Sequence, residues 1–349
     1  MADLTIKDIA KLCNVSISTV SRAMNNDPGI NEKTKERVLE VVNKFHYIPN
    51  NSARNLKMVE SNTIGLLIKG INNPFFQGLM ALFESEMKKE GYTFQLQALR
   101  EEDDAATVAM QLAKEKRLKG IVFLGGRMEY PDADLQNIPI PFVLCSVAVE
   151  VERSSISSPS VTIDDEKESY RAANYLISQG HERIAFITGH EDDTTVARLR
   201  FSGYKRALED ANIPYDPELV CYTPANQDSY TEECGYQLAS RILKSGKKFT
   251  AFYAISDRMA VGVYKAVDDA GKKVPDDYSV MGFDGIPLTK YMIPPLTTMV
   301  QPAEQMAKSS MDLLMKQIRG EDAHEKLIYD ARLKVRDSVR KIKRTAEFK

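Results

Sequence analysis

The feature of the sequence that most constrains the fold is a regular alternation of short apolar runs with amphipathic segments, which begins at residue 64. Residues 64–68 are apolar without interruption, as in a strand buried on both faces of a sheet. Residues 75–90 then show helical periodicity and end at Gly91. The alternation continues through strands predicted at 94–99, 120–124 and 140–145 and a helix predicted at 107–117. It predicts an α/β fold with a parallel, doubly wound sheet.

The alternation starts again with a strand predicted at 161–163, so the body of the chain contains two series of strands and helices. Further strands are predicted at 183–187, 220–222, 251–255 and 279–283, with helices at 168–179, 201–211 and 259–270 and another that ends at 243. Ten or more strands exceed the number that a twisted open sheet usually holds. We therefore expect two sheet lobes of similar size.

The first 62 residues have a different pattern, in which three short helices are expected between residues 4 and 46. Thr5 is placed to cap the first helix, and Ser16 is placed to cap a second helix at 17–24, because serine and threonine hydroxyls accept hydrogen bonds from the free N–H groups of a first turn. The turn-forming residues 25–29 separate it from a longer third helix.

The first two helices have the spacing of a helix-turn-helix, in which the second helix enters the major groove of DNA. Their apolar residues Ile9, Ala10, Val15 and Val20 are spaced to bury between them. Short hydroxyls suit phosphate oxygens, and an arginine fork can read guanine. The expected contacts are Ser16, Ile17, Ser18, Thr19, Ser21, Arg22 and Asn25. The alternative, a helical hairpin with a solvated polar face, agrees less well with the turn, the caps and the small polar face together.

The charge distribution is compatible with DNA binding but does not establish it. Residues 1–62 carry nine lysines and arginines against seven acidic residues, whereas the remainder carries 38 against 42. A basic head on an acidic body is thus expected. The N-terminus has no signal-peptide core and no stretch is apolar enough to cross a membrane, so the sequence predicts a cytosolic protein.

No catalytic, metal or cofactor motif is found in the sequence. The four cysteines form no C-x-x-C pair, and the four histidines lack metal-ligand spacing. No Walker A loop, G-x-S-x-G or G-x-G-x-x-G motif is present. The pair Gly125 and Gly126 is interpreted as a structural turn, and His181 as a packed residue at a helix end. An enzyme on an α/β fold is therefore the least favoured of the hypotheses.

These motifs resemble those of the lactose/galactose-repressor family of bacterial transcription regulators. The resemblance covers the head, the segments 47–50 and 73–76, the segment 180–184, and the segments 282–284 and 293–298. It implies a helix-turn-helix head, a hinge helix and a body shaped like a periplasmic sugar-binding protein. The expected parts are a DNA-binding domain at 1–49, a hinge and linker at 50–62, a ligand-binding and dimerisation domain at 63–340 and a frayed basic tail at 341–349.

The resemblance also implies further DNA contacts. Leu56 stands at the family's minor-groove wedge position, one helical turn after Ala53, and an apolar wedge between base steps kinks DNA. A helix this short is marginal alone, so it is expected to fold only on DNA. Thr5, Ile6 and Asn50 complete the predicted DNA-binding set. The alternative is a solvated linker with a chance leucine.

The resemblance places the effector site in a cleft between the two lobes. Its residues combine carboxylate, guanidinium, amide and aromatic groups, which together suit a sugar or another polyol. They are Phe75, Phe76, Ser146, Arg200, Tyr230, Ser256, Asp284 and Gln301. For each charged member the alternative is a structural or solvated ion. Ser146 replaces a frequent acidic residue and Ser256 a frequent asparagine, so the site departs from the family's usual hexose pattern and the identity of the effector stays open.

The leading hypothesis is therefore a homodimeric DNA-binding regulator, most consistent with a repressor, whose partners are an operator and a small-molecule effector. Its C-terminus, from residue 335 onward, has no leucine heptads for a tetramer. The alternative is a transport or chemosensory sugar-binding protein, which the body alone would allow. The helix-turn-helix head and the absence of a signal peptide argue against it, because fold alone does not define function.

Overall fold

The computed structural model describes residues 6–24, 27–44, 61–100, 103–126, 135, 137–147 and 158–343. The chain divides into two compact units, Met1–Ser61 and Asn62–Lys349. Several predicted DNA contacts lie outside the described residues, as does the predicted hinge helix. These contacts are Thr5, Asn25, Asn50, Ala53 and Leu56.

The head contains the three predicted helices, α1 (Ile6–Leu12), α2 (Ile17–Met24) and α3 (Glu32–Lys44). They enclose a small apolar core formed by Ile9, Ala10, Cys13, Val20, Ala23 and Val38. Val15 packs against this core while remaining partly accessible. Asn14 has a φ of 51° in the turn between α1 and α2, a conformation that asparagine tolerates better than most residues. The predicted helix-turn-helix geometry is thus confirmed.

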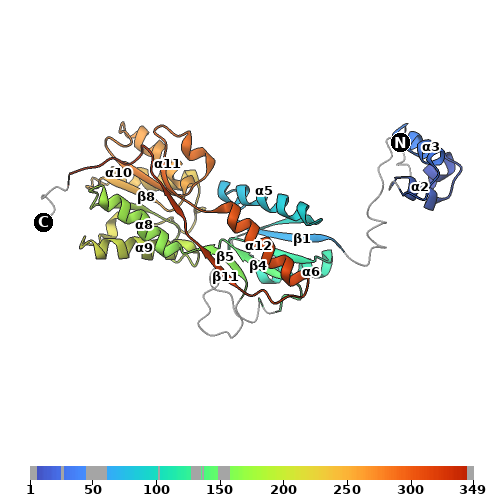
Figure 1. Ribbon diagram of the computed structural model, residues 1–349. Helices are drawn as coiled ribbons and strands as arrows, with labels where there is room; N and C mark the ends of the chain where they lie inside the picture. Colours follow the sequence, from blue (N-terminus) through green and yellow to red (C-terminus); the bar gives the residue numbers. More distant parts are fainter. Residues whose placement is uncertain are drawn as a thin grey trace. The chain divides into compact units, whose positions relative to one another are not determined.

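The body consists of two lobes, each built on a six-stranded sheet (Figure 1). The first sheet has the order β11-β5-β4-β3-β1-β2 and the second the order β12-β10-β9-β8-β6-β7. The strands of the first are β1 (Thr63–Lys69), β2 (Thr93–Leu99), β3 (Gly120–Leu124), β4 (Phe142–Cys145), β5 (Ser160–Ile163) and β11 (Lys326–Tyr329). Those of the second are β6 (Ile184–Ile187), β7 (Val220–Cys221), β8 (Ala251–Ala254), β9 (Ser279–Asp284), β10 (Thr297–Val300) and β12 (Arg332–Lys334).

Helices cover both faces of each sheet, which is why the central strands are apolar throughout. In the first lobe, α5 (Pro74–Lys89) packs on α12 (Ala303–Ile318), and α6 (Ala105–Lys116) covers the other face. In the second lobe, α8 packs on α9 and α10 on α11, on opposite sides of β8 (Figure 1). Their bounds are α8 (Asp165–Ser178), α9 (Val196–Asp210), α10 (Glu232–Lys244) and α11 (Asp257–Asp269). The predicted two-lobed, doubly wound architecture is confirmed.

The strand predicted to begin the second lobe belongs instead to the first sheet. β5 pairs in parallel with β4, with Leu144 opposite Ser160. The chain crosses to the second lobe only afterwards, at Asp164. The local pattern of an apolar strand followed by a helix is the same in both positions, so it carries no information about which sheet the strand joins.

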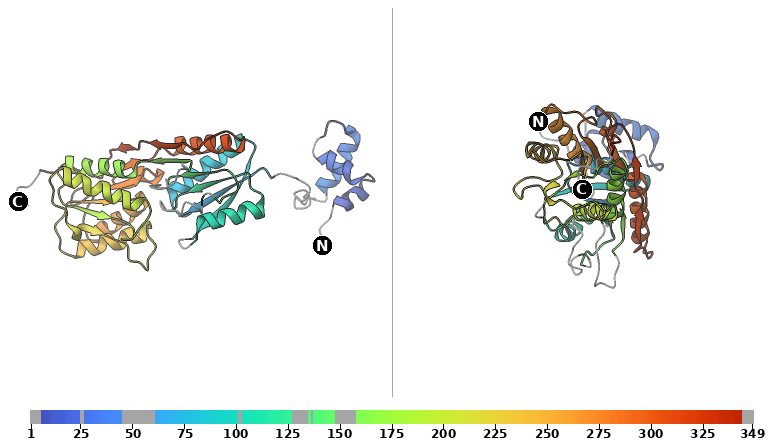
Figure 2. Two further views of the ribbon diagram at one scale, coloured as in Figure 1. Left: turned by 90° about the horizontal axis from the view of Figure 1, so that it is seen from below. Right: turned by 90° about the vertical axis from the view of Figure 1, so that its left-hand side faces the viewer.

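The chain after residue 283, for which no helix or strand was predicted, joins the two lobes. After β10 the chain returns to the first lobe as α12 and β11, and then crosses back to form β12. This segment, drawn in orange to red, is seen from two directions in Figure 2. β12 runs antiparallel to β10, unlike the other described strand pairs. Together with the crossing after β5, these connections form a hinge of three chain segments.

Four smaller findings bear on the predicted boundaries and features. α9 begins at Val196, five residues before the predicted start, because Thr195 caps it. Ile342 donates its N–H to the carbonyl of Gln179 at 2.8 Å, so the tail predicted to fray from residue 341 is packed at least to Ile342. All four cysteines are buried thiols. Within the described part of the chain, no helix is long and apolar enough to span a membrane.

Candidate functional site

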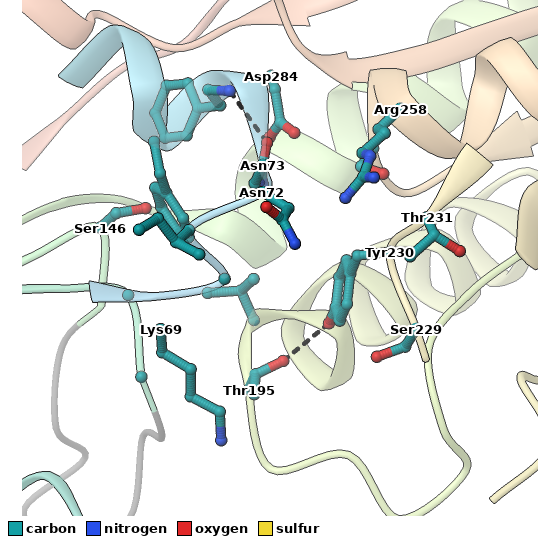
Figure 3. Close-up of a pocket in the computed structure, with 18 of the residues that line it drawn as sticks. Lys69, Asn72, Asn73, Ser146, Thr195, Ser229, Tyr230, Thr231, Arg258 and Asp284 are labelled. Carbon is teal, nitrogen blue, oxygen red and sulfur yellow. Dashed lines mark hydrogen bonds between the residues drawn. The ribbon is translucent and has the colours of Figure 1, made fainter. Parts of the chain in front are cut away.

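A cavity of about 560 Å³ lies between the two lobes of the body (Figure 3). Many of the residues that line the cavity lie at the carboxyl ends of strands, such as Ser146 directly after β4 and Asp284 as the last residue of β9. This is where parallel α/β sheets bind ligands. All eight residues predicted for the effector site line the cavity, with Phe75, Phe76 and Ser146 from the first lobe and Arg200, Tyr230, Ser256, Asp284 and Gln301 from the second.

Arg200 is the most firmly held side chain of the cavity, with only 4% of it exposed. Its Nε donates to Asp165 Oδ1 at 2.8 Å and its Nη1 to the carbonyl of Ile255 at 2.6 Å. Its Cζ lies 3.7 Å from the ring centroid of Phe283. Burial acts to lower the pKa of Arg200, but the carboxylates of Asp165 and Asp284 raise it above its ordinary value. Arg200 is therefore a permanent cation with a structural partner in Asp165.

Asp284 presents a carboxylate oxygen to the cavity. Its Oδ1 accepts from Gln301 Nε2 at 2.9 Å and, at a longer 3.4 Å, from Arg200 Nη1. No residue of the described chain forms a hydrogen bond to Oδ2, so this oxygen is available as an acceptor for a ligand. Burial raises the pKa of Asp284 to about 6, against the opposing effect of Arg200.

Asp257, which was not among the predicted site residues, holds the turn that carries Asp284. Its Oδ2 accepts from the backbone N–H groups of Gly285 at 2.6 Å and Ile286 at 2.8 Å. Burial, reinforced by the charge of Asp284, raises the pKa of Asp257 well above its ordinary value. Asp284 itself has a φ of 115°, an unusual conformation for a residue with a side chain and one that clusters at ligand sites.

Ser256 has a structural role in addition to lining the cavity. It is the N-cap of α11, and its Oγ accepts from the N–H of Met259 at 3.2 Å. The hydroxyl is thus already engaged in helix capping, which is worth about 1 kcal/mol in a typical helix. If Ser256 binds a ligand, as predicted, it does so through its O–H group or through the lone pair of Oγ that the helix cap does not use.

Tyr230 forms a fixed aromatic wall of the cavity. Its hydroxyl donates to Asp193 Oδ2 at 3.0 Å and lies 2.8 Å from Thr195 Oγ1, which can donate to it in turn (Figure 3). Burial and then the charge of Asp193 raise the pKa of Tyr230 well above its ordinary value. Its backbone φ is 61°. Both its ring position and its neutral hydroxyl are therefore set before any ligand binds.

The opposite wall is apolar and belongs to the first lobe. Phe75 and Phe76 lie with ring centroids 5.6 Å apart at the start of α5, which Asn73 caps by accepting from Phe75 N–H at 3.0 Å. Gly125 has a φ of 71°, and a Cβ at this position would lie 2.8 Å from Phe76 Cζ. The turn at Gly125 is thus required for the packing of Phe76, as the structural interpretation of this glycine pair predicted.

Several further residues that line the cavity were not predicted, because most of them match no short motif and lie in loops or at the ends of helices and strands. They are Lys69, Asn72, Asn73, Arg100, Asp193, Thr195, Asp228, Ser229, Thr231 and Arg258. The Asp193-Thr194-Thr195 capping sequence before α9 is a signal that could have identified two of them. No group of three or more potential metal ligands occurs among the described residues.

His181 is buried and packs at a helix end. Its Nδ1 lies 2.9 Å from Thr250 Oγ1 and its Nε2 lies 3.1 Å from the carbonyl of Arg340. Because a carbonyl can only accept, Nε2 carries the proton. Burial lowers the pKa of His181 to about 4, so the ring is neutral. It lies outside the cavity lining, in agreement with its interpretation as a packing residue.

The helix α2 presents one polar face and one buried face. Ile17, Ser18 and Arg22 are exposed, whereas Val20 and Ala23 are buried in the core of the head. Ser16 caps the helix, with its Oγ accepting from Thr19 N–H at 3.1 Å. The predicted DNA contacts at Ser16, Ile17, Ser18 and Arg22 thus lie on the solvent side of the helix, and Thr19 and Ser21 are half-buried beside them.

Two features of the head were not predicted. Arg22 Nη2 donates to Asp27 Oδ1 at 3.1 Å, and both side chains are exposed. An exposed pair of this kind contributes little to stability, so breaking it to reach a base costs little. Ile6, predicted to touch DNA, is half-buried against the apolar core of the head, and part of its surface is thus used in packing.

The pKa of Asp284 predicts that effector affinity depends on pH. A ligand hydroxyl that donates to Oδ2 needs an ionised carboxylate, and with a pKa of about 6 the free protein must lose a proton before such a ligand binds at lower pH. Affinity is expected to be constant above about pH 7 and to fall by up to about tenfold per pH unit well below pH 6. Isothermal titration calorimetry of the effector across this range measures the effect.

The matched control for this measurement is Asp284→Asn, which removes the titrating group and keeps an oxygen for Gln301. Its residual affinity should be independent of pH over the same range. An unchanged pH profile in Asp284→Asn would assign the titration to another group, and the buried carboxyls Asp165 and Asp257, both of which interact electrostatically with Asp284, are the first candidates.

A DNA-reading helical head joined to a two-lobed α/β body with a polar cleft defines the class of ligand-binding transcription regulators. Comparisons with known proteins agree with this class. Residues 5–50 match the model of the bacterial regulatory proteins of the lacI family, and residues 173–339 match the periplasmic binding protein-like domain. The chain belongs to the lacI family of bacterial regulatory proteins.

Individual relatives are similar over nearly the whole chain. The transcriptional regulator MalR of Clostridium butyricum is 39% identical over 341 residues, covering 96% of this chain and 99% of that protein. The ribose operon repressor of Haemophilus influenzae is 30% identical over 341 residues, covering 97% and 99%. The solved complex of the transcriptional regulator CelR with cellobiose has a TM-score of 0.70 and 26% identity, covering 96% of this chain and 99% of that one. This chain is thus similar to these regulators along nearly its whole length.

Proposed function

We propose that this protein is a transcription repressor that binds its operator as a homodimer and whose DNA affinity is controlled by a neutral, polyhydroxylated effector in the cleft between the lobes. The observation that carries the proposal is the buried group of Arg200, Asp284 and Gln301. It combines a fixed cation, a fixed amide and an unoccupied carboxylate oxygen in one wall. Vicinal hydroxyls of a sugar donate to such an oxygen and accept from such cations.

The two arginines of the second lobe that line the cleft are charge-balanced, which favours a neutral ligand over an anionic one beside them. The cation of Arg200 is matched by Asp165 and Asp284, and that of Arg258 by Glu232. An anion such as a sugar phosphate would need uncompensated cations around it. The wall formed by Tyr230 offers an apolar face for the C–H groups of a sugar ring, which completes the chemistry that a polyol requires.

The DNA-binding part of the proposal rests on the head. The exposed hydroxyls of α2 suit phosphate oxygens and Arg22 suits a guanine edge. A two-fold protein reads a two-fold operator, so two copies of the head are needed. Leu288, Tyr291 and Ile293 are 51%, 70% and 92% exposed within one short segment of the body. Apolar side chains gathered in this way are typical of a protein interface, and we assign them to the dimer.

The remaining parts of the proposal follow from this role. The named relatives are regulators rather than enzymes, and we propose that this chain also acts by binding alone. Because its target is bacterial DNA, we propose that it acts in the cytosol. The repressor role is supported by the ribose operon repressor of Haemophilus influenzae, which is similar to this chain over nearly its whole length.

A thermal-shift screen tests the class of effector. Neutral sugars, sugar phosphates and nucleosides are added to the full chain, and the ligand that binds the folded state raises its melting temperature. At 100 times its dissociation constant a ligand stabilises by about 2.7 kcal/mol, which corresponds to a shift of several degrees. We expect the shift from a neutral sugar and none from sugar phosphates. A shift produced by phosphorylated compounds or nucleosides alone would refute the assignment.

A further inference from the structure

The cleft contains a second group of polar side chains, nearer its mouth than the buried group of Arg200, Asp284 and Gln301. Asn72 from the first lobe and Arg258 from the second point into the same part of the cavity (Figure 3). Asn72 is exposed, whereas Arg200, Asp284 and Gln301 are each no more than 5% exposed. The cavity therefore has a buried polar part and an accessible polar part.

Both side chains of the mouth come from positions that the fold holds in place. Asn72 lies in the turn between β1 and α5, directly before Asn73, whose side chain caps α5. Arg258 is the second residue of α11, and its Nε donates to Glu232 Oε2 at 2.6 Å. No other hydrogen bond within the described chain engages the guanidinium of Arg258. Its Nη groups are thus donors that a ligand can use without breaking the pair.

Tyr230 connects the buried part to the mouth. In Figure 3 it lies between Arg258 and Thr195. Its hydrogen bonds to Asp193 and Thr195 fix the ring. Since aromatic faces pack against the apolar faces of sugar rings, one fixed ring beside two groups of hydrogen-bonding side chains is an arrangement suited to two successive rings. A cavity of about 560 Å³ is within the range of roughly 300–1,000 Å³ that is typical of small-molecule sites.

The chemistry of the mouth selects against an anion as the second group. Lys69 and Arg100 line the same cavity, but Asp193 and Asp228 line it as well, and Arg258 is already paired with Glu232. Amide and guanidinium donors beside carboxylates are complementary to several hydroxyls, each of which both donates and accepts. The mouth is therefore suited to a hydroxyl-rich neutral group.

We propose that the mouth is a second sugar subsite, formed by Asn72, Arg258 and Tyr230, and that the effector is a neutral oligosaccharide of at least two rings. One ring binds at Arg200, Asp284 and Gln301, and the next binds between Asn72 and Arg258. This inference rests on the proposed function, in which the cleft binds a neutral polyol. Because Asn72 and Arg258 belong to different lobes, the second ring also contacts both lobes.

Isothermal titration calorimetry with the full chain tests the subsite. The probes are glucose and galactose, and the disaccharides maltose, cellobiose and lactose. At least one disaccharide should bind about 30-fold or more tightly than either monosaccharide, because its second ring adds hydrogen bonds to a charged group. Asn72→Ala and Arg258→Ala should each weaken that disaccharide by about tenfold and leave monosaccharide affinity within twofold of wild type.

The controls separate this inference from the proposed function. Asp284→Asn should weaken disaccharide and monosaccharide alike, and Lys308→Ala, an exposed residue on α12 outside the cavity, should weaken neither. Melting curves by circular dichroism verify that each variant is folded.

If a monosaccharide binds as tightly as every disaccharide and depends on Asp284, the proposed function holds and the second subsite is wrong. If Asn72→Ala and Arg258→Ala weaken both sugar classes equally, the subsite is also wrong. If none of the five sugars binds, both the subsite and the sugar assignment fail.

Discussion

Asp284→Asn is expected to abolish the response to effector while DNA binding without effector stays within about twofold of wild type. The substitution places an amide N–H₂ where the carboxylate Oδ2 faces the cavity, so a hydroxyl donor loses its acceptor. Hydrogen bonds to charged groups contribute about 1.5–3 kcal/mol, and effector affinity should fall by about 10- to 150-fold. Asparagine also retains the oxygen that accepts from Gln301 and tolerates the positive φ of this position better than alanine.

The measurement is a fluorescence-anisotropy titration of DNA selected from a random pool by the wild-type protein, with and without the sugar found in the thermal-shift screen. A ligand shifts DNA affinity only by its differential affinity for two states, and a coupling of about 1–3 kcal/mol changes DNA affinity about 5- to 150-fold. A fully responsive Asp284→Asn protein would show that the sensor site lies elsewhere. Loss of DNA binding without effector would show that Asp284 is structural.

Arg200→Ala is the contrasting variant, because the structure gives Arg200 a second role. Removing its guanidinium leaves the carboxylate of Asp165, which is 3% exposed, without its cationic partner. Breaking a buried pair in this way typically costs about 3–5 kcal/mol. A loss of effector response in Arg200→Ala is therefore accompanied by a lower melting temperature, whereas in Asp284→Asn it is not.

A truncated chain that begins at Asn62 should keep effector binding and lose all detectable DNA binding. The body is a separate compact unit from Asn62 onward, and its main apolar core, which contains residues of both lobes, lies wholly within it, so it is expected to fold without the head. The DNA-contacting groups that we propose within the described residues all belong to the head. Anisotropy titrations on selected and random DNA at two salt concentrations, with melting curves as a folding control, measure the loss.

Within the full chain, Arg22→Ala should weaken binding to selected DNA by about 1–3 kcal/mol and relax preference at one base position per half-site. The exposed residue Lys308 supplies the matched control as Lys308→Ala. Retained sequence-specific binding by the truncated chain would refute the assignment of the head. An equal loss on selected and random DNA in Arg22→Ala would show that Arg22 contacts phosphate rather than a base.

Much of the architecture could be predicted from sequence because it depends on short-range patterns. The head helices follow from capping residues and helical spacing, as at Ser16 and Val20, and the two lobes follow from the alternation of apolar runs with helices. The eight predicted cleft residues were identified by family motifs, and the fold brings all of them to one cavity. Their binding of an effector stays a prediction.

The sequence by itself thus determined the kinds of elements, their approximate bounds and the motifs that mark the cleft and the DNA-reading helix. Only the tertiary structure decided that β5 joins the first sheet, that Asp165 holds Arg200, that Asp257 holds the turn after Asp284, and that Asn72 and Arg258 share the mouth of the cleft. The physical reason is the range of the interactions. Caps and periodicity act within a few residues, whereas Asp165 and Arg200 are 35 residues apart and Arg200 and Asp284 are 84 apart. Such partners lie on separate elements of the second lobe and meet only when its sheet and helices are folded together.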